Sequence, residues 1–360
     1  MVLNLLEKLL VEHELSYEEI VYLLTHLDDA SERTLFQYAH QTRLDFYGNR
    51  VYLRGLIEFS NVCRRNCLYC GIRASNQSVE RYRMLPEDIL QCCKHGYGLG
   101  YRTFVLQSGE DPWYTTDILV SLIRDIKGRF PDVAITLSIG ERPFLDYLAF
   151  HKAGADRFLM RHETADGVLY ARLHPGTSLR ERIASLEALK EIGFQVGDGF
   201  MVGLPGQGPE ELAKDLTFLR DLHPDMIGIG PFIPHSQTPL HDCEGGTVRQ
   251  TLIMVALARL LVPDALLPAT TALGTLHSRG REQALSVGAN VVMPNLTPAR
   301  VRPKYQLYEN KICVEEDSDQ CRSCIEWRIE LAGLKVDMGR GDSLRSMKRR
   351  PSESTAMGAI

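Results

Sequence analysis

Three cysteines lie close together in the chain with a spacing that suits an iron–sulfur cluster. Cys63, Cys67 and Cys70 form the pattern C-x3-C-x2-C directly after an apolar run. Three thiolates on one loop would bind a [4Fe–4S] cube and leave one of its irons without a protein ligand, so that a small molecule could chelate it. A zinc site is the alternative, but structural zinc normally takes four protein ligands. No fourth Cys or His lies nearby in the sequence.

Three more cysteines form a second set further along the chain. Cys313, Cys321 and Cys324 have the spacing C-x7-C-x2-C. They predict an auxiliary cluster, for which we favour [2Fe–2S] with a fourth ligand from outside the set; zinc is the alternative. The remaining cysteines are Cys92 and Cys93, which fall in a helix-like segment and are expected to pack, and Cys243, which has no assigned role.

The composition is that of an ordinary globular protein. The 360 residues carry 41 Lys and Arg against 46 Asp and Glu, hence a net charge of −5, with 44% hydrophobic and 24% charged residues. These values argue against a disordered chain, a fibrous repeat and a strongly basic nucleic-acid binder. The longest apolar stretch is too short to span a membrane, and the first residues do not resemble a signal peptide. We therefore expect a cytoplasmic enzyme without nucleic-acid or membrane partners, in which clustered thiols favour metal binding.

The hydrophobic pattern predicts an α/β fold, a closed parallel (β/α)8 barrel of the TIM type. Short apolar runs alternate with longer segments of helical period, and eight such alternations are typical of this barrel. The expected strands are 51–59, 103–107, 134–139, 157–161, 195–202, 226–232, 266–272 and 291–293. The expected helices include 86–95, 116–129, 179–192, 210–222, 249–261 and 280–287.

The same pattern divides the chain into four parts. Residues 1–50 form a helical N-terminal extension, 51–308 the barrel, 309–338 a C-terminal segment with the auxiliary cysteines, and 339–360 a flexible tail. The carboxyl ends of barrel strands converge on one mouth, where the chemistry of such barrels occurs. Because Cys63 follows the first expected strand, the cysteine loop is predicted to lie at that mouth.

The cysteine pattern resembles that of the radical S-adenosylmethionine (SAM) enzymes. The resemblance includes the aromatic Tyr69 before the third cysteine. In that family the open iron is chelated by the amino and carboxylate groups of SAM. An electron from the reduced cluster then cleaves the sulfonium and yields a 5′-deoxyadenosyl radical. The resemblance thus implies a [4Fe–4S] cluster on Cys63, Cys67 and Cys70 and SAM as cofactors.

Further stretches, in order between about residues 50 and 324, are similar to those of [FeFe]-hydrogenase maturases of this superfamily. They are EFSNVCRRNCLYCGIR, RYRM, VLQSGEDPWY, RHETAD, MVGLPGQ, IGIGPFIPH, PATTALGT, ANVVMPN and YQLYENKIC. This resemblance implies a step in assembling the two-iron subcluster of the hydrogenase. The substrate it implies is an iron–cysteine complex carrying CO and cyanide, delivered by the maturase HydG. The implied product passes to the scaffold maturase HydF, and the implied electron donor is a ferredoxin or flavodoxin.

The resemblance also assigns residues to SAM. A turn after the second strand, with Gln107, Ser108, Gly109 and Glu110, matches the position that holds the SAM amino group. Glu163 would accept the ribose hydroxyls, and Arg182 would pair with the SAM carboxylate. The other expected contacts are Tyr69, Ser138, Met201 in the Gly- and Pro-containing segment 201–206, and Met226. For Ser138 a strand-end cap and for Met226 a core position are the alternatives.

The expected substrate contacts match positions that line a deep cavity in the related maturases. They are Arg54, Ser108, Arg161, Thr270, Thr271, Met293 and Tyr305. An inward arginine on a barrel strand is costly unless it is paired or binds an anion. Arg54 and Arg161 therefore suit a ligand that carries a carboxylate or cyanide.

Two other functions remain open at this level. One is a different radical SAM enzyme, either a mutase similar to methylornithine synthase or a sulfur-inserting enzyme similar to biotin synthase. Cysteines that follow the eighth expected strand face away from a barrel interior, which argues against sulfur insertion. The other is a non-catalytic iron–sulfur carrier, for which Glu163 and Arg182 would have no purpose. Formation of 5′-deoxyadenosine separates an enzyme from a carrier.

Overall fold

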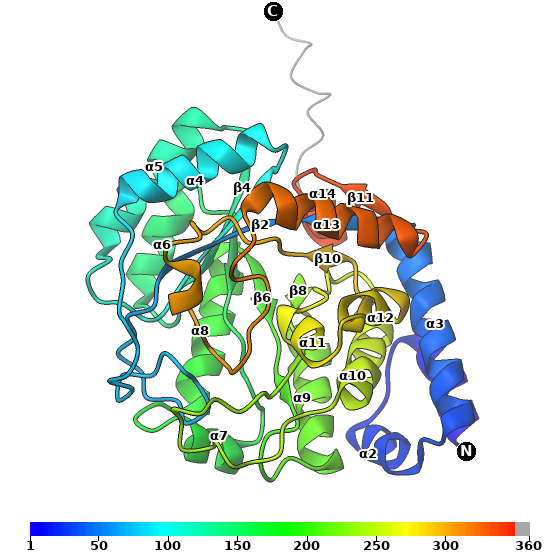
Figure 1. Cartoon of the computed structure of the whole chain (residues 1–360). Coiled ribbons are helices and arrows are strands. Elements are labelled where there is room, and N and C mark those ends of the chain that lie inside the picture. Colours follow the sequence, from blue (N-terminus) through cyan, green and yellow to red (C-terminus); the bar gives the residue numbers. More distant parts are fainter. Residues whose placement is uncertain (350–360) are drawn as a thin grey trace, which may run out of the picture.

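Parallel strands surrounded by helices form the centre of the computed structural model, which describes residues 1–349 (Figure 1). The strands are short and almost entirely buried, as expected of parallel strands covered by helices. They are β1 (Arg50–Leu53), β2 (Gly55–Ser60), β3 (Thr103–Ser108), β4 (Ala134–Ser138), β5 (Arg157–Leu159), β6 (Gln195–Asp198), β7 (Met201–Val202), β8 (Met226–Ile227), β9 (Gly230–Pro231), β10 (Val291–Val292) and β11 (Lys335–Asp337).

The strands pair in parallel around a barrel-like core. Six of them form one sheet in the order β2-β3-β4-β5-β6-β8, and β1 lies between β10 and β11 in a second sheet. The two sheets are linked between β8 and β10 by single bridges, from Met226 to Leu266 and from Pro268 to Val291. The predicted α/β barrel architecture is confirmed, although its closing part has isolated bridges where the rest has ladders.

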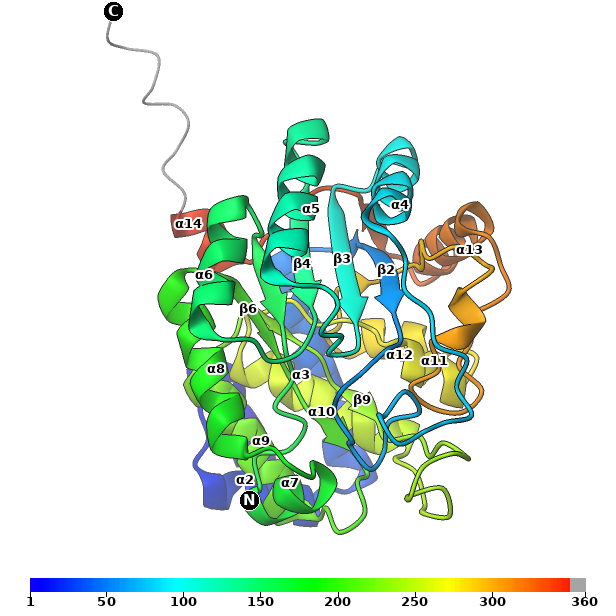
Figure 2. The same ribbon diagram turned by 90° about the vertical axis from the view of Figure 1, so that its left-hand side faces the viewer.

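Helices cover the outside of the strands, and Figure 2 shows α4, α5, α6 and α8 over β2, β3, β4 and β6. The barrel helices are α4 (Pro86–Gly98), α5 (Thr116–Arg129), α6 (Phe144–Ala153), α7 (Gly167–Leu173), α8 (Leu179–Ile192), α9 (Pro209–Leu222), α10 (Val248–Leu261), α11 (Thr271–Leu276) and α12 (Gly280–Ser286). A 3-10 turn (Arg302–Lys304), α13 (Ser318–Leu331) and α14 (Leu344–Arg349) follow. Several begin at side-chain caps, such as the Ser178–Glu181 capping box of α8, which satisfies backbone N–H groups of the first turn.

The first fifty residues form helices that pack on the barrel. They are α1 (Val2–Glu12), α2 (Tyr17–His26), which begins with the predicted Ser16–Glu19 capping box, and α3 (Asp29–Tyr47). Helix α3 packs against α10 and α2 against α9. Among residues 1–349 no helix is long and apolar enough to cross a bilayer.

Some predicted strands differ from the observed ones. The segment 51–59 is interrupted at Arg54, 195–202 at Gly199 and Phe200, and 226–232 at Gly228 and Ile229. The segment 266–272 is not a strand, because only its bridges pair and Thr270 already caps helix α11. Helices α6, α7 and α13 were not expected; α13 carries Cys321 and Cys324.

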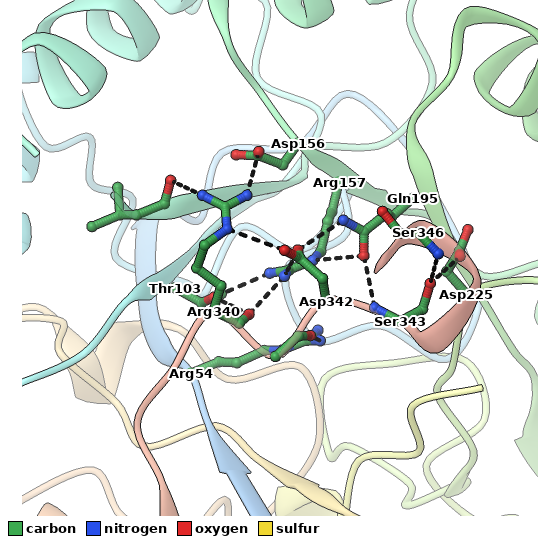
Figure 3. A network of polar contacts seen from close by, with 12 residues as sticks. Arg54, Thr103, Asp156, Arg157, Gln195, Asp225, Arg340, Asp342, Ser343 and Ser346 are labelled. Atoms are coloured by element: carbon green, nitrogen blue, oxygen red, sulfur yellow. Dashed lines mark hydrogen bonds and ion pairs between the residues drawn. The ribbon is translucent and has the colours of Figure 1, made fainter. Parts of the chain in front are cut away.

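A segment after β11 closes the end of the barrel opposite the cysteine loop, here called the floor (Figure 3). Asp342 contacts the Arg157 guanidinium at 2.5 Å and accepts from Gln195 at 2.8 Å, and Ser343 donates to Asp225. Arg340 pairs with Asp156 at 2.6 Å. The prediction of a flexible tail from residue 339 is therefore wrong for residues 340–343, which buried ion pairs hold in place. Residues 350–360 of that predicted tail lie outside the described residues.

We predict that Asp342→Asn destabilises the protein by about 3 kcal/mol, because it leaves the buried Arg157 charge without its carboxylate. Burial alone would raise the pKa of Asp342, but Arg157, Gln195 and Arg340 hold it below its ordinary value. A lowered carboxyl pKa contributes stability above the unfolded pKa that is lost as the pH falls through the acidic range. The difference between wild type and variant in denaturant unfolding should therefore shrink below about pH 4.

Asp337→Asn is the matched control. Asp337 lies in the preceding strand β11 and pairs with the half-exposed Arg50 at 3.8 Å. A surface pair of this kind is worth about 0–1 kcal/mol. Equal losses in the two variants would contradict a floor held by Asp342.

Candidate active site

The cysteine loop leaves the carboxyl end of β2 and lies at the mouth of the barrel (Figure 2). Backbone hydrogen bonds fix it to distant segments, with the Leu68 N–H on the Leu173 carbonyl at 2.9 Å and the Gly71 N–H on the Leu307 carbonyl at 2.8 Å. Its three cysteines, Cys63, Cys67 and Cys70, are free thiols and only partly exposed. The loop is thus a fixed element that presents three thiols at the predicted place.

These thiols resist ionisation where they lie. Burial raises the pKa of Cys67 to about 12, and the neighbouring Cys63 adds to the rise. Burial and the neighbouring thiols also raise the pKa of Cys70, and burial raises that of Cys63. Three thiolates could therefore coexist here only beside positive charge, which iron supplies when it binds them.

The donor set of the loop suits an iron–sulfur cluster. Cys63, Cys67 and Cys70 are three free thiols on one loop, and an iron–sulfur cube bonds each cysteine at a different iron. Within residues 1–349 no group of three or more His, Cys, Asp or Glu side chains is arranged to hold a single metal ion. Cys63, Cys67 and Cys70 would therefore hold a [4Fe–4S] cluster.

Arginine–glutamate contacts hold the loop against the neighbouring strands. Arg64 and Arg65, between the first two cysteines, contact Glu110 Oε2 at 3.0 and 2.6 Å. Arg65 also contacts Glu141 at 2.6 Å, and Glu141 in turn pairs with Arg182 at 2.6 Å. The Glu110 carboxylate thus binds the cysteine loop itself, which leaves only the backbone of its turn for the predicted contact with SAM.

The turn after β3 approaches the cysteine loop very closely at Gly109. A Cβ atom on Gly109 would lie 2.4 Å from the Val62 carbonyl oxygen and 2.7 Å from the Cys63 Cβ. The Gly109 N–H donates to the Ser60 carbonyl at 3.0 Å, and the Ser108 hydroxyl donates to the Gly109 carbonyl at 2.7 Å. Glycine is therefore required here by the space between two backbones.

Glu163, after β5, has a strained backbone and a carboxylate oxygen open to a ligand. Its φ is 68°, a left-handed value that costs a non-glycine residue about 1–2 kcal/mol. Its Oε2 lies 3.1 Å from an Arg161 guanidinium nitrogen but is buried and has no hydrogen-bond partner within the described chain. A buried acceptor of this kind fits the predicted role of accepting ribose hydroxyls.

Tyr69 and Met201 line an apolar cluster beside the cysteine loop. Met201 packs there with Leu169, Leu204 and Phe232, and Tyr69 packs against the cluster. The Tyr69 hydroxyl lies 2.8 Å from His174 Nε2. Burial lowers the pKa of His174 to about 4, and Arg182 adds to the effect. The imidazole is therefore neutral, and its Nε2 accepts a hydrogen bond from the Tyr69 hydroxyl. The apolar surface suits the adenine predicted for this place.

Two of the predicted residues lie instead at the floor. Met226 packs with Leu266 and Val291, and its Sδ lies 2.9 Å from an Arg54 nitrogen. The prediction that Met226 contacts the adenosyl group together with Met201 is therefore wrong. The two methionines lie in separate clusters because Met226 begins β8 at its amino end.

Arg54 shares the floor with a small cavity. The cavity is lined by Arg54, Thr136, Arg157, Gln195, Asp225 and Met226, among others. Arg54 is buried and donates to the Gly341 carbonyl at 3.0 Å. Burial and the nearby Arg157 lower its pKa. Neither Arg54 Nε nor Thr136 Oγ1 has a hydrogen-bond partner in residues 1–349, and the cavity beside them is small and has the Asp225 carboxylate in its lining.

The remaining predicted residues lie around the interior. Gln107 and Ser138 are register partners on β3 and β4, and a hydrogen bond joins Tyr305 to Gln107. Thr270 caps α11, and the Thr271 hydroxyl lies 3.3 Å from an Arg281 nitrogen. Met293 packs on the cluster that contains Met226. The predicted contacts therefore divide between the mouth and the floor.

The auxiliary cysteines are only partly assembled. Cys313 shares a hydrogen bond with Cys321, which together with Arg281 lowers the pKa of Cys313 to about 6. Cys324 is exposed one turn along α13, beside Arg328. Two of the three thiols thus lie together, one of them ready to bind a metal.

Sequence reasoning missed several residues at the mouth. They are Arg64, Arg65, Glu141 and His162, together with a buried Lys311–Glu58 pair. The two arginines lie inside the cysteine motif. Positive charge beside expected metal ligands is a sequence signal from which acidic partners could have been predicted. The partners of His162 lie in segments far from it in the sequence, and no local pattern identifies them.

Comparisons with known proteins agree with this site. Residues 57–219 match the family model of the radical SAM superfamily. The chain is 48% identical over 92% of its length, and 94% of the relative's, to the [FeFe] hydrogenase maturase subunit HydE of Thermotoga maritima. It is 31% identical to a 3-methylornithine synthase of Methanosarcina acetivorans, covering 79% and 81% of the two chains. The crystal structure of methylornithine synthase PylB has a TM-score of 0.81 and 28% identity, and the match covers 92% of this chain and 97% of that one.

We predict that Gly109→Ala lowers the iron and sulfide bound after anaerobic reconstitution, because its Cβ would displace the backbone before Cys63. The overpacked site should also lose about 1–3 kcal/mol of stability. The control is Gly128→Ala, on α5, where a Cβ meets nothing within 4 Å. That change should leave iron content unaltered and stabilise the helix by up to about 1 kcal/mol. Full iron content in Gly109→Ala would refute the packing argument.

Proposed function

Because this chain belongs to the radical SAM superfamily and, within it, to the HydE family, we propose that it acts in assembling the two-iron subcluster of the [FeFe]-hydrogenase active site. The reaction we propose is reductive cleavage of SAM and attack on an iron–cysteine complex that carries CO and cyanide. The observation that carries the proposal is the C-x3-C-x2-C loop at the mouth of a barrel in a chain 48% identical to a HydE maturase. The match covers 92% of this chain.

Each part of the mouth has a role in this proposal. Bound to Cys63, Cys67 and Cys70, a [4Fe–4S] cluster supplies the electron that converts SAM to a 5′-deoxyadenosyl radical. The Glu163 carboxylate accepts the ribose hydroxyls, and Tyr69 and Met201 exclude water beside the adenine. The backbone of the turn with Ser108 and Gly109 receives the amino group.

Arg182 and Ser138 complete the proposed SAM site from the neighbouring elements. Burial opposes the charge of Arg182, but Tyr170 and the Glu141 carboxylate hold its pKa above the usual arginine value. Arg182 therefore stays charged and can share its guanidinium between Glu141 and the SAM carboxylate. Gln107 and Ser138 lie beside each other at the ends of β3 and β4, where they can donate to SAM or to the substrate.

The substrate is proposed to lie deeper in the barrel. Arg161, Ser108 and Tyr305 approach it from the mouth, and Thr270, Thr271 and Met293 border the remaining side. An organometallic complex with cyanide carries negative charge, which the Arg161 and Arg54 guanidinium groups would balance. Arg54 keeps one guanidinium nitrogen without a hydrogen-bond partner within residues 1–349, which supports its part in that balance.

The proposal implies protein partners and a second metal site. The substrate would come from HydG and the product would go to HydF, with ferredoxin or flavodoxin as electron donor. An auxiliary [2Fe–2S] cluster would bind Cys313, Cys321 and Cys324, with a fourth ligand from outside. The adjacent thiols of Cys313 and Cys321 support a metal there, and the exposure of Cys324 supports a site near the surface.

A mutase acting on an amino acid is the second candidate. The TM-score of 0.81 to methylornithine synthase and the 31% identity to a related synthase favour it. Such an enzyme needs charged groups for both ends of an amino acid, and Arg161 and Arg54 would serve only the carboxylate. Incubating the enzyme with candidate amino acids or with the iron–cysteine complex, followed by product analysis, decides between the two functions.

We predict that Cys67→Ala abolishes the formation of 5′-deoxyadenosine from SAM under anaerobic conditions with dithionite, because two thiolates cannot hold the cube in place. Cys92→Ala, which removes a buried thiol of α4 away from the loop, should retain it. Chromatography of the quenched reaction measures the product. Product formation by Cys67→Ala at the wild-type level would exclude the radical SAM mechanism.

The auxiliary set allows a second prediction. Cys321→Ala should remove iron from the second site while 5′-deoxyadenosine formation and hydrogenase activation persist, because Cys321 lies on α13 outside the barrel. Iron content, product formation and activation of apo-hydrogenase by a maturation mixture are the three measurements. Loss of SAM cleavage in this variant would show that the second set takes part in the reaction.

A further inference from the structure

A fully buried charged group lies behind the proposed adenosyl site and is used by none of the roles described above. His162 follows β5, directly before Glu163, and is completely inaccessible to solvent. Its Nδ1 lies 2.8 Å from Asp198 Oδ2, and its Nε2 lies 3.3 Å from Asp215 Oδ1. The rings of Phe200 and Phe218 cover it at 5.8 and 4.8 Å. The imidazole is therefore enclosed by two carboxylates and two aromatic rings.

This group also holds the backbone on both sides of Glu163. The N–H of His162 donates to Asp198 Oδ1 at 2.8 Å, and the N–H of Ala165 donates to Asp215 Oδ1 at 2.5 Å. Between these two hydrogen bonds Glu163 adopts its left-handed φ of 68°. Strained backbone persists only where its surroundings determine it. Here the two aspartates do so together with a strand bridge, in which the Glu163 N–H donates to the Gly199 carbonyl and the Glu163 carbonyl accepts from the Met201 N–H, each at 3.1 Å.

Gln207 extends the contacts to the loop that carries Met201. Its amide nitrogen donates to Asp215 Oδ2 at 3.2 Å and to the Met201 carbonyl at 2.9 Å. Its amide oxygen accepts from the N–H groups of Gly203 at 2.7 Å and Leu204 at 3.2 Å. One side chain, Asp215 on α9, therefore contacts the turn with Glu163 and the residue that shapes the loop 201–204.

The buried group holds one imidazole between two carboxylates, so its charges do not cancel completely. Burial alone would lower the pKa of His162, but Asp198 and Asp215 raise it to about 9. Burial raises the pKa of Asp215, and His162, Ala165 and Gln207 oppose that rise. At neutral pH a protonated imidazole thus lies between two carboxylates. Such buried charges often add less to stability than apolar side chains of the same size, so their arrangement calls for a role other than packing.

We propose that His162, Asp215 and Gln207 are positioning residues that fix the Glu163 carboxylate and the Met201 loop relative to each other, and that they thereby set the affinity for the adenosyl part of SAM. The inference rests on the proposed function, because it needs an adenosyl ligand between these two loops. None of the three touches that ligand. They act through Glu163 and the backbone of residues 201–204.

The test measures the two halves of SAM separately on the cluster-loaded chain. Isothermal titration calorimetry with 5′-deoxyadenosine and with methionine is carried out anaerobically on wild type, Asp215→Asn and Gln207→Ala. In both variants the affinity for 5′-deoxyadenosine should fall by about tenfold, the size of one lost charge-assisted hydrogen bond. The affinity for methionine should not change, because the cysteine loop and Arg182 lie outside the altered contacts. Gln207→Ala serves as the second variant if Asp215→Asn does not fold, since Gln207 is only partly buried.

Asp264→Asn is the matched control. Asp264 pairs at 3.0 Å with His223, the residue that caps the carboxyl end of α9. The substitution therefore changes a histidine–aspartate contact at one end of the same helix. It touches neither loop and should leave both affinities unchanged, whatever its effect on the melting temperature. A loss that follows melting temperature in all three variants would overturn the inference and assign the group to stability alone.

The outcomes separate the inference from the proposed function. If wild type binds neither methionine nor 5′-deoxyadenosine, the proposed function fails, and the inference fails with it. If wild type binds both while Asp215→Asn and Gln207→Ala bind 5′-deoxyadenosine equally well, only the inference is overturned. A parallel loss for methionine also overturns it, because positioning of the adenosyl half alone could not produce that result.

Discussion

Burial of three thiols on one loop is the constraint on which the rest of the site depends. Cys63, Cys67 and Cys70 are partly buried, and burial raises the pKa of each. The loop cannot rely on solvent to stabilise its ligands, so its shape has to be fixed by other contacts. Arg64 and Arg65 provide them through Glu110 and Glu141, and Gly109 allows the neighbouring turn to come close. Each of these partners lies at the carboxyl end of a strand, and a parallel barrel brings those ends together.

Charged side chains contact side chains of opposite charge at each level of the barrel interior. At the mouth, guanidinium groups and carboxylates alternate from Arg65 through Glu141 to Arg182. Behind it His162 lies between two aspartates, and at the floor Arg157 pairs with Asp342. Some contacts remain incomplete. A Glu163 oxygen and His162 Nε2 near the mouth, and an Arg54 nitrogen at the floor, have no hydrogen-bond partner within residues 1–349.

Local patterns predicted the parts of the protein that depend on neighbours in sequence. The barrel class, the helices from Thr116 to Arg129 and from Leu179 to Ile192, and the cysteine loop follow from periodicity, caps and spacing. The buried position of residues 340–343 was not predicted, because a polar, glycine-containing segment resembles a flexible tail unless its buried partners are known. Met226 begins its expected strand, so the sequence already put it at the amino end, away from the mouth. The core position given as its alternative is the one that the structure shows. The clustering of His162, Asp215 and Gln207 needed three separate segments to be placed in space.

The floor connects early and late parts of the chain. Arg54 donates to the carbonyl of a residue 287 positions later, and Arg157 pairs with one 185 positions later. Contacts of such long range form late in folding, since the intervening chain must first be ordered. During ribosomal synthesis, strands β1 to β6 therefore emerge well before the residues that neutralise their inner arginines. Until residues 340–343 are synthesised, the barrel lacks the contacts that Gly341 and Asp342 make with its inner arginines.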